Sequence, residues 1–215
     1  MPLGPVEIEV IRNALTAAAA EMDVTVWRTS RSTIVRELLD YSTAVFDAEG
    51  NNLAQSARIP SHLNSMSHLL RELLDRHVDP AGWGPEDVVV TNDPYCGGQH
   101  LPDIVAFKPV LHEGRRIAFV GTLCHHIDVG GLAAGSYAAK AIEIYQEGLR
   151  IPPVKLIEDG AWRDVPVWDR DALPPEVRIA GPAILEEPFA THWIGRGWTA
   201  APGPAGALIA VRTTP

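Results

Sequence analysis

Apolar residues recur every three or four positions between Val6 and Thr29, which is the spacing of one face of an amphipathic helix. Pro5 suits the first turn of such a helix, and the alanine run at 17–20 has high helix propensity. A short second helix is expected over residues 32–39. The same spacing returns between Ser61 and His77, so a third helix is predicted there, with an inner face formed by Met66, Leu69, Leu70, Leu73 and Leu74.

Short runs of β-branched and aromatic residues, bounded by turn residues, predict strands in the rest of the first 160 positions. These runs lie at residues 41–47, 53–57, 88–90, 104–107 and 117–120, and extended segments are expected at 142–145 and 149–156. The chain also holds 18 Gly and 18 Pro residues, which favours many turns over a helical bundle. The pattern therefore predicts an α+β fold, with N-terminal helices packed on a mixed or antiparallel sheet and a small β-rich tail after it.

The character of the sequence changes near Asp159. Beyond this residue helical periodicity disappears, and short apolar runs alternate with Pro, Gly and Ala. We therefore predict two units, with residues 1–160 forming the domain that carries the chemistry and residues 161–215 forming the β tail.

Charge and composition narrow the possible partners. The chain has 18 basic and 27 acidic residues, a formal net charge of −9, so nonspecific binding to nucleic acid or to anionic membranes is not expected. No apolar run approaches the roughly 18–20 residues that a membrane span needs, and the N-terminal residues lack a signal-peptide pattern. Two cysteines are too few for a disulfide framework. These features predict a cytoplasmic protein without nucleic-acid or membrane partners.

Candidate metal ligands gather in three segments, residues 37–42, 92–103 and 123–131. His100 and Asp103 are three positions apart in a loop that glycines allow to bend, so both side chains can converge on one ion. His125 follows an apolar strand, which would give it a rigid support. Imidazoles with carboxylates suit Zn²⁺, Mn²⁺ or Fe²⁺ and leave a position for water or substrate. Ordinary structural roles remain open for these residues, such as a solvent-facing His126 or a loop-capping Asp128.

Several long segments, in the same order along the chain, resemble the B subunit of hydantoinases and 5-oxoprolinases. They are residues 37–42, 59–66, 92–104, 125–131 and 147–156, so the resemblance covers about Pro5 to Ile157. It implies a role in the ATP-dependent opening of cyclic amides such as 5-oxoproline or hydantoin. In such enzymes an A-type subunit uses ATP to phosphorylate the amide oxygen, and the B-type subunit hydrolyses the activated species. ATP would then be bound by the partner, and this chain indeed has no standard phosphate-binding glycine motif.

The resemblance also implies a set of site residues. One divalent transition metal would be held by Asp40, His100, Asp103 and His125, and it would position the attacking water and polarise the activated carbon. Asp128 and His126 would take catalytic roles by orienting the ligands or relaying protons. A homo- or hetero-oligomer with the A-type subunit is implied as well. Related complexes that carboxylate acetone or acetophenone provide an alternative reaction.

The tail resembles a different protein, the C-terminal end of the hydantoinase A subunit, in residues 167–174, 179–188 and 195–198. A whole B subunit continues well beyond the Arg150–Pro153 motif, so the chain resembles the front of a B subunit joined to the back of an A subunit. A noncatalytic metal-binding or assembly module, or a truncated remnant, is therefore the alternative to an active enzyme component.

Overall fold

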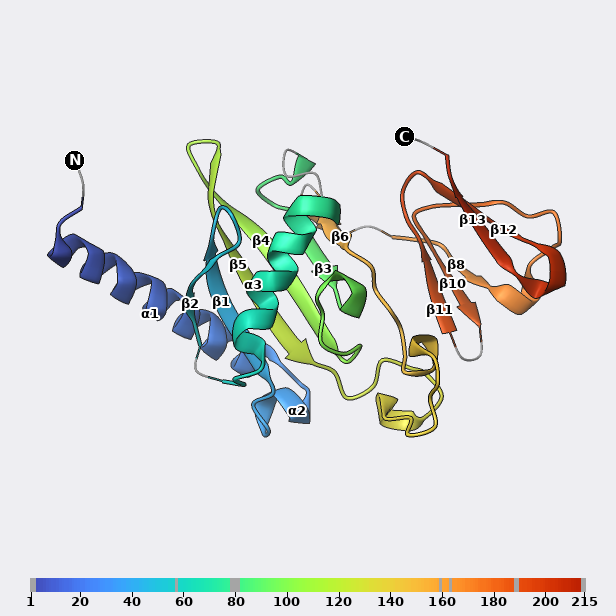
Figure 1. Ribbon diagram of the computed structural model, residues 1–215, viewed down its shortest axis with the longest axis horizontal. Helices are drawn as coiled ribbons and strands as arrows, with labels where there is room; N and C mark the ends of the chain where they lie inside the picture. The colour runs from blue at the N-terminus through green and yellow to red at the C-terminus, as the bar shows by residue number, and fades with distance from the viewer. Residues whose placement is uncertain are drawn as a thin grey trace.

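The computed structural model describes residues 3–56, 58–77, 82–158, 160–162, 164–187 and 190–213. A seven-stranded sheet forms the centre of the fold, in the order β2-β1-β5-β4-β3-β6-β7 (Figure 1). Every described pair of neighbouring strands in it is antiparallel. The strands are β1 Tyr41–Asp47, β2 Asn52–Gln55, β3 Val88–Thr91, β4 Asp103–His112, β5 Arg115–His125, β6 Val154–Glu158 and β7 Ala161–Trp162.

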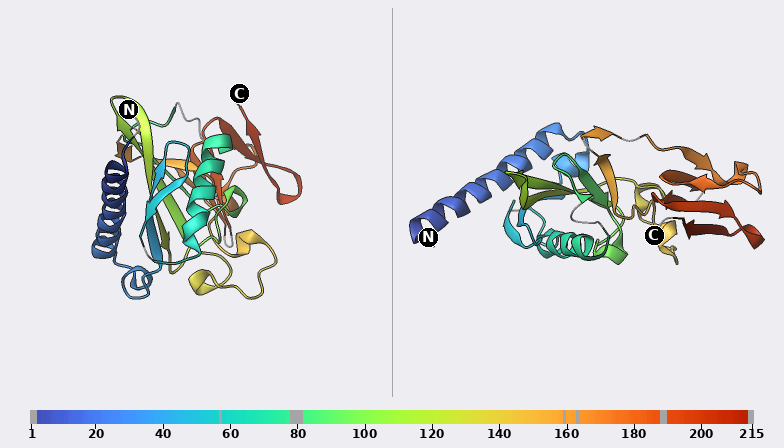
Figure 2. Two further views of the ribbon diagram at one scale, coloured as in Figure 1. Left: turned by 60° about the vertical axis from the view of Figure 1, so that its left-hand side comes forward. Right: turned by 90° about the horizontal axis from the view of Figure 1, so that it is seen from above.

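Helices cover the two faces of this sheet. Helix α1, Pro5–Thr29, lies on one face, and α3, His62–Glu72, lies on the other, as the view from above shows (Figure 2). Helix α2 is a single turn, Thr33–Arg36, and is shorter than predicted. Helix α3 continues as a π-helical turn, Leu73–His77. The predicted α+β class, with N-terminal helices packed on a sheet that is antiparallel, is confirmed.

The main apolar core lies between α3 and the sheet. Side chains on a strand alternate between its faces, so every second residue of β1, β4 and β5 points towards α3. The aromatic rings of Phe46, Phe107 and Phe119 occupy these positions and are fully buried. From α3 they meet the inner face that the sequence predicted, with Met66, Leu69, Leu70 and Leu73 buried and Leu74 partly buried.

Helix α1 is covered over its C-terminal half alone. There Ala19 packs against Val45 of β1 and Ala54 of β2. The N-terminal half projects beyond the β2 edge of the sheet (Figure 1), and Ile8 and Ile11 are 53% and 46% exposed. The predicted helix is therefore confirmed, and its apolar face is covered over the C-terminal half alone, because the sheet ends before the helix does.

The strands differ from their predicted bounds in two informative ways. Strands β4 and β5 extend well beyond the apolar runs at 104–107 and 117–120, because they pair with each other along almost their whole length. The extended segment predicted at 142–145 is wrong: Ile144–Gln146 form a 3-10 turn, in which the Gln146 side chain accepts hydrogen bonds from the Ile142 and Glu143 amides. Strand β2 ends at Gln55, and Ala57 of the predicted strand lies outside the described residues.

The turn between β4 and β5 supplies a stability prediction. Glu113 and Gly114 have φ of 50° and 76°, which is the left-handed pair of a two-residue hairpin turn. Asparagine tolerates this conformation better than glutamate, so Glu113→Asn should raise the free energy of unfolding by about 0.5–1 kcal/mol, a part of the left-handed penalty. Thermal unfolding should show a higher midpoint for Glu113→Asn and a lower one for Gly114→Ala. A lower midpoint for both variants would contradict the turn assignment.

The β tail contains two three-stranded sheets, ordered β11-β10-β8 and β13-β12-β9. Its strands are β8 Val167–Asp169, β9 Ile179–Ala180, β10 Ala183–Glu187, β11 Ala190–Ile194, β12 Trp198–Pro202 and β13 Leu208–Arg212. The tail has its own buried cluster, formed by Ile179, Ala183, Leu185, Ile194 and Ala200. The predicted boundary near residue 160 stays a prediction, and β7 just beyond it still pairs with β6. Within the described ranges, no helix has the length and apolar character to cross a membrane.

Candidate metal centre

Three segments of the chain meet at one end of the large sheet. Asp103 is the first residue of β4 and His125 is the last residue of β5, and the two are direct partners in the strand register. Asp40 immediately precedes β1, and its backbone carbonyl accepts a 3.1 Å hydrogen bond from the His125 amide. Since β5 runs antiparallel to both neighbours, its end meets the beginnings of β1 and β4.

The strand alternation places Asp103 and His125 on the face that α3 covers. Two residues further into each strand, Val105 and Leu123 belong to the main apolar core. Asp103 and His125 therefore lie at the edge of that core and are themselves buried. His100 reaches the same place from the loop before β4, where the Asp103 amide donates to the His100 carbonyl at 3.1 Å.

Short contacts join these side chains. His125 Nδ1 lies 2.9 Å from Asp103 Oδ1, and His100 Nε2 lies 2.9 Å from Asp103 Oδ2. One potential ligand atom from each of His100, Asp103 and His125 lies within 4.8 Å of the others, so this group could hold a metal ion. The Asp40 carboxylate is close as well, at 3.9 Å from His125 Nδ1, and its side chain is 31% exposed. The structure thus brings the predicted ligands together, and their assignment as ligands remains a prediction.

One carboxylate oxygen of this group, Asp103 Oδ2, is well placed to bind a cation. Asp103 Oδ2 is buried, and among the described residues it has no hydrogen-bond partner of good geometry, although His100 Nε2 is only 2.9 Å away. A buried carboxylate oxygen is normally hydrogen-bonded or bound to a metal ion. Two imidazoles around such an oxygen form a donor set that suits a divalent transition metal.

The electrostatics keep the central carboxylate ionised. Burial raises the pKa of Asp103, but contacts with the His100 and His125 imidazoles outweigh it, and the net pKa lies below the usual value. The same contact with Asp103 raises the pKa of His100, against the opposing effect of burial. The group therefore attracts positive charge, which either a proton or a metal ion can supply.

A further histidine, His62, lies beside this group and was not among the predicted site residues. It is the first residue of α3 and is 3% exposed, and burial lowers its pKa. Its Nε2 faces Asp40 Oδ1 at 3.8 Å and Asp103 Oδ2 at 3.7 Å. The segment 59–66 contributed to the family resemblance, but no spacing within it connects position 62 to residues 40 and 103.

The two predicted catalytic residues, His126 and Asp128, lie in the exposed segment after β5. His126 Nδ1 is 3.0 Å from the Cys124 carbonyl, so its proton sits on Nδ1 when the ring is neutral. The Asp128 carboxylate accepts hydrogen bonds from the Gly130 and Gly135 amides at 2.7 and 2.9 Å, and these bonds lower its pKa. Asp128 thus shapes the glycine-rich loop that follows the candidate ligands.

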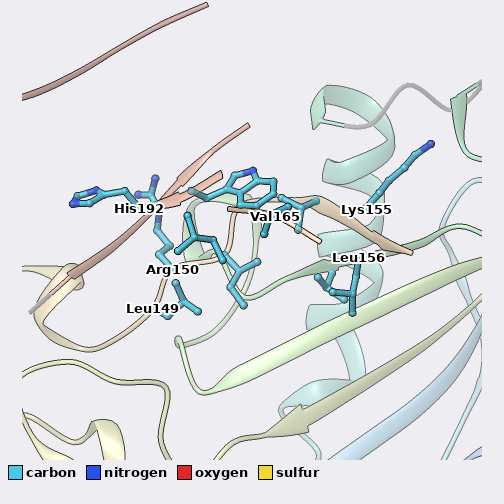
Figure 3. A pocket seen from close by; sticks show the side chains of 11 residues that line it. Leu149, Arg150, Lys155, Leu156, Val165 and His192 are labelled. Carbon is cyan, nitrogen blue, oxygen red and sulfur yellow. The ribbon is translucent and has the colours of Figure 1, made fainter. Parts of the chain in front are cut away.

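A separate cavity of about 200 Å³ lies where β6 meets the tail strands β10 and β11 (Figure 3). Its lining is mostly apolar, with Arg150, Lys155 and His192 among the residues around it. Arg150 Nε is 3.6 Å from an Asp93 carboxylate oxygen, and Lys155 Nζ is 2.7 Å from one of Asp87. These two cations already have carboxylate partners. The cavity lies between the large sheet and the tail, and none of the candidate ligands lines it.

The fold is α+β, and His100, Asp103 and His125 gather at the open end of the antiparallel β4–β5 hairpin, opposite its turn. The sequence matches the Hydantoinase B/oxoprolinase family over residues 4–172, and the chain belongs to this family. It is 38% identical over 160 residues to caprolactamase subunit beta of Pseudomonas jessenii, which covers 74% of this chain and 27% of that protein. It is 36% identical over 159 residues to 5-oxoprolinase 1 of Arabidopsis thaliana, covering 74% and 12%.

Solved structures agree with this assignment. The crystal structure of the ATP-dependent caprolactamase from Pseudomonas jessenii matches with a TM-score of 0.67 at 35% identity, over 76% of this chain and 28% of that one. The nucleotide-free structure of acetone carboxylase matches with a TM-score of 0.66 at 24% identity, over 72% and 21%, which is a likeness of fold. The chain thus spans between 12% and 28% of the length of these relatives.

Proposed function

We propose that this chain is the metal-binding part of an ATP-dependent hydrolase that opens cyclic amides of the 5-oxoproline, hydantoin or lactam type. The observation that carries the proposal is the convergence of His100, Asp103 and His125 at the end of the β4–β5 hairpin, in a member of this family. Relatives named 5-oxoprolinase and caprolactamase support the substrate class, since 5-oxoproline and caprolactam are both cyclic amides.

The proposed ligands of one Zn²⁺, Mn²⁺ or Fe²⁺ ion are Asp40, His100, Asp103 and His125. Bound there, the ion would supply Lewis-acid polarisation of the activated carbon and of the attacking water. Asp103 and His125 are fixed by the hairpin register, whereas Asp40 is partly exposed on the solvent side. The substrate would therefore approach from the side of Asp40 and the exposed His126.

His126 and Asp128 are proposed to assist the reaction. With its proton on Nδ1, His126 presents Nε2 as the basic nitrogen, which suits the relay of a proton. Asp128 would act by holding the loop that begins at the ligand His125, through its bonds to Gly130 and Gly135. Both roles are proposals supported by their place in the chain and by these contacts.

An A-type subunit is the proposed partner and the proposed site of ATP binding. The relative from Pseudomonas jessenii is named a beta subunit, and its crystal structure is that of an ATP-dependent enzyme. A homo- or hetero-oligomer follows from this arrangement. We further propose that the tail is related to the C-terminal end of the A subunit, as the resemblance of residues 179–188 and 195–198 implies. The Hydantoinase B match extends into the first part of this tail, to residue 172, and the tail has a core of its own.

The proposal is tested by measuring metal content first and turnover second. The purified chain should hold about one transition-metal ion, because the four proposed ligands form one site. Mixed with the A-type subunit of a caprolactamase or 5-oxoprolinase, it should open 5-oxoproline, hydantoin or caprolactam in an ATP-dependent reaction.

Each other result has a distinct meaning. Consumption of a ketone that depends on bicarbonate would replace the hydrolase with a carboxylase. Bound metal without turnover of any cyclic amide would leave a noncatalytic metal-binding module. A chain that takes up none of these metals would overturn the metal centre itself.

A further inference from the structure

His62 stands apart from the proposed ligands and has no role in the function proposed above. It is buried at the start of α3, and its ring lies between Ser42 of β1 and the two carboxylates of the site. Ser42 is buried too and projects from β1 on the same face as the apolar core. A polar ring in this place needs an explanation, because each nitrogen of a buried imidazole costs free energy unless it finds a partner.

The contacts define which ring nitrogen carries the proton. Nε2 faces Asp40 Oδ1 at 3.8 Å and Asp103 Oδ2 at 3.7 Å, and both are negatively charged acceptors. A lone pair on Nε2 would be repelled by them, so the neutral ring places its proton there. Nδ1, 2.9 Å from Ser42 Oγ, then accepts a hydrogen bond from the Ser42 hydroxyl.

We propose that His62 is a positioning residue that orients Asp40 and Asp103 as metal ligands, with its tautomer set by the two carboxylates and matched by the Ser42 hydroxyl. The inference rests on the proposed metal centre. His62 is not itself a ligand, because its Nε2 proton points at the carboxylates. The present distances exceed a direct hydrogen bond by roughly 0.5–1 Å, so a small shift of the carboxylates on binding an ion would close the contact.

The two carboxylates need such steering for different reasons. Asp40 follows a residue with an unusual backbone, Leu39 at φ 57°, and its side chain is 31% exposed, so rotamers that point away from the site are accessible to it. Asp103 is buried, but its Oδ2 has no hydrogen-bond partner of good geometry among the described residues. A fixed N–H donor between the two oxygens would hold Asp40 towards the site and give Asp103 Oδ2 a partner. Hydrogen bonds from neighbouring groups commonly orient ligating carboxylates in this way.

The experiment compares metal affinity across matched variants of the full chain. The variants are His62→Ala, His62→Gln and Ser42→Ala. His68→Gln changes an exposed histidine on the same helix, and Ser67→Ala removes a buried hydroxyl that donates to the Gly50 carbonyl at 2.7 Å. Zn²⁺ affinity is measured by competition with a chelator, and the Co²⁺-loaded protein is examined by visible absorption. Thermal unfolding of the metal-free proteins shows which variants are folded.

His62→Ala should weaken Zn²⁺ binding about 10- to 100-fold, which is the usual effect of losing an outer partner of a ligand. It should also shift the Co²⁺ absorption bands, since the carboxylates adopt new positions. His62→Gln retains an N–H donor and should recover part of the affinity, and Ser42→Ala should weaken it less than His62→Ala. The two control variants should bind like the unaltered chain.

Two results would overturn the inference in separable ways. If the unaltered chain binds Zn²⁺ and folded His62 variants bind it equally well with unchanged Co²⁺ spectra, His62 has no positioning role and the metal centre stands. If the unaltered chain binds neither ion, the metal centre fails and the inference fails with it. Should His62→Ala not fold, His62→Gln and Ser42→Ala decide the question by the same measurements.

Discussion

Replacing Asp103 with alanine should abolish tight metal binding by this chain. Its two oxygens contact both histidines, at 2.9 Å from His125 Nδ1 and 2.9 Å from His100 Nε2, so no other residue of the group touches as many partners. Even residues that only orient metal ligands change affinity about 10- to 100-fold, so loss of the central ligand should exceed about 100-fold. Isothermal titration of the metal-free protein with Zn²⁺ measures the change directly.

Two companion variants make the Asp103 result specific. Asp103→Asn keeps the shape and one oxygen of the side chain but removes the charge, so it should bind metal better than Asp103→Ala and worse than the unaltered chain. Asp47→Ala removes a carboxylate at the far end of β1, where it accepts bonds from the Glu49 and Asn51 amides, and should leave the affinity unchanged. Unaltered Zn²⁺ binding in folded Asp103→Ala would exclude Asp103 as a ligand.

Replacing Asn92 with alanine should cause the largest loss of stability among single substitutions outside the apolar core. Asn92 is fully buried, and its side chain joins three segments. Its amide donates to the Leu101 and Leu149 carbonyls at 2.7 and 2.8 Å, and its oxygen accepts from the Ile151 amide at 2.6 Å. The alanine variant leaves one buried and two partly buried backbone groups without these partners, at about 1–3 kcal/mol each before relaxation or entry of water.

Partial relaxation should reduce this sum, so we expect Asn92→Ala to lower the free energy of unfolding by about 3–5 kcal/mol, a large share of the total for a domain. Denaturant unfolding followed by circular dichroism measures it. Asn52→Ala is the control, since Asn52 is partly buried and, among the described residues, its side-chain amide donates to the Gln55 side chain alone. A cost below that of the control would show that Asn92 does not hold these segments together.

Much of the site could be predicted because its parts lie close in sequence or at strand ends. His100 and Asp103 share one short loop, and an apolar strand followed by His125 places that residue at the end of the sheet. Their convergence needed only the antiparallel pairing of two neighbouring strands, which the turn at Glu113–Gly114 made predictable. Asp40 came from the family resemblance, because no local pattern links it to the hairpin.

The features that sequence patterns missed depend on tertiary contacts. His62 meets Ser42, Asp40 and Asp103 from a different element, so no periodicity marks it as part of the site. The apolar positions of α1 predict a helix correctly, but they do not show where the sheet beneath it ends. Likewise, the alternation at 142–145 is compatible with a strand. The segment instead forms a turn, in which the Ile142 and Glu143 amides donate hydrogen bonds to the Gln146 side chain.

The register of the β4–β5 hairpin makes half of the candidate centre a local property of the chain. Asp103 and His125 become neighbours when this single hairpin closes, and a slip of one residue would turn the opposed side chains to opposite faces of the sheet. The pair therefore depends on contacts between residues that lie close in the sequence. Two candidate ligands encoded in this way need only the sequence of one hairpin to be placed side by side.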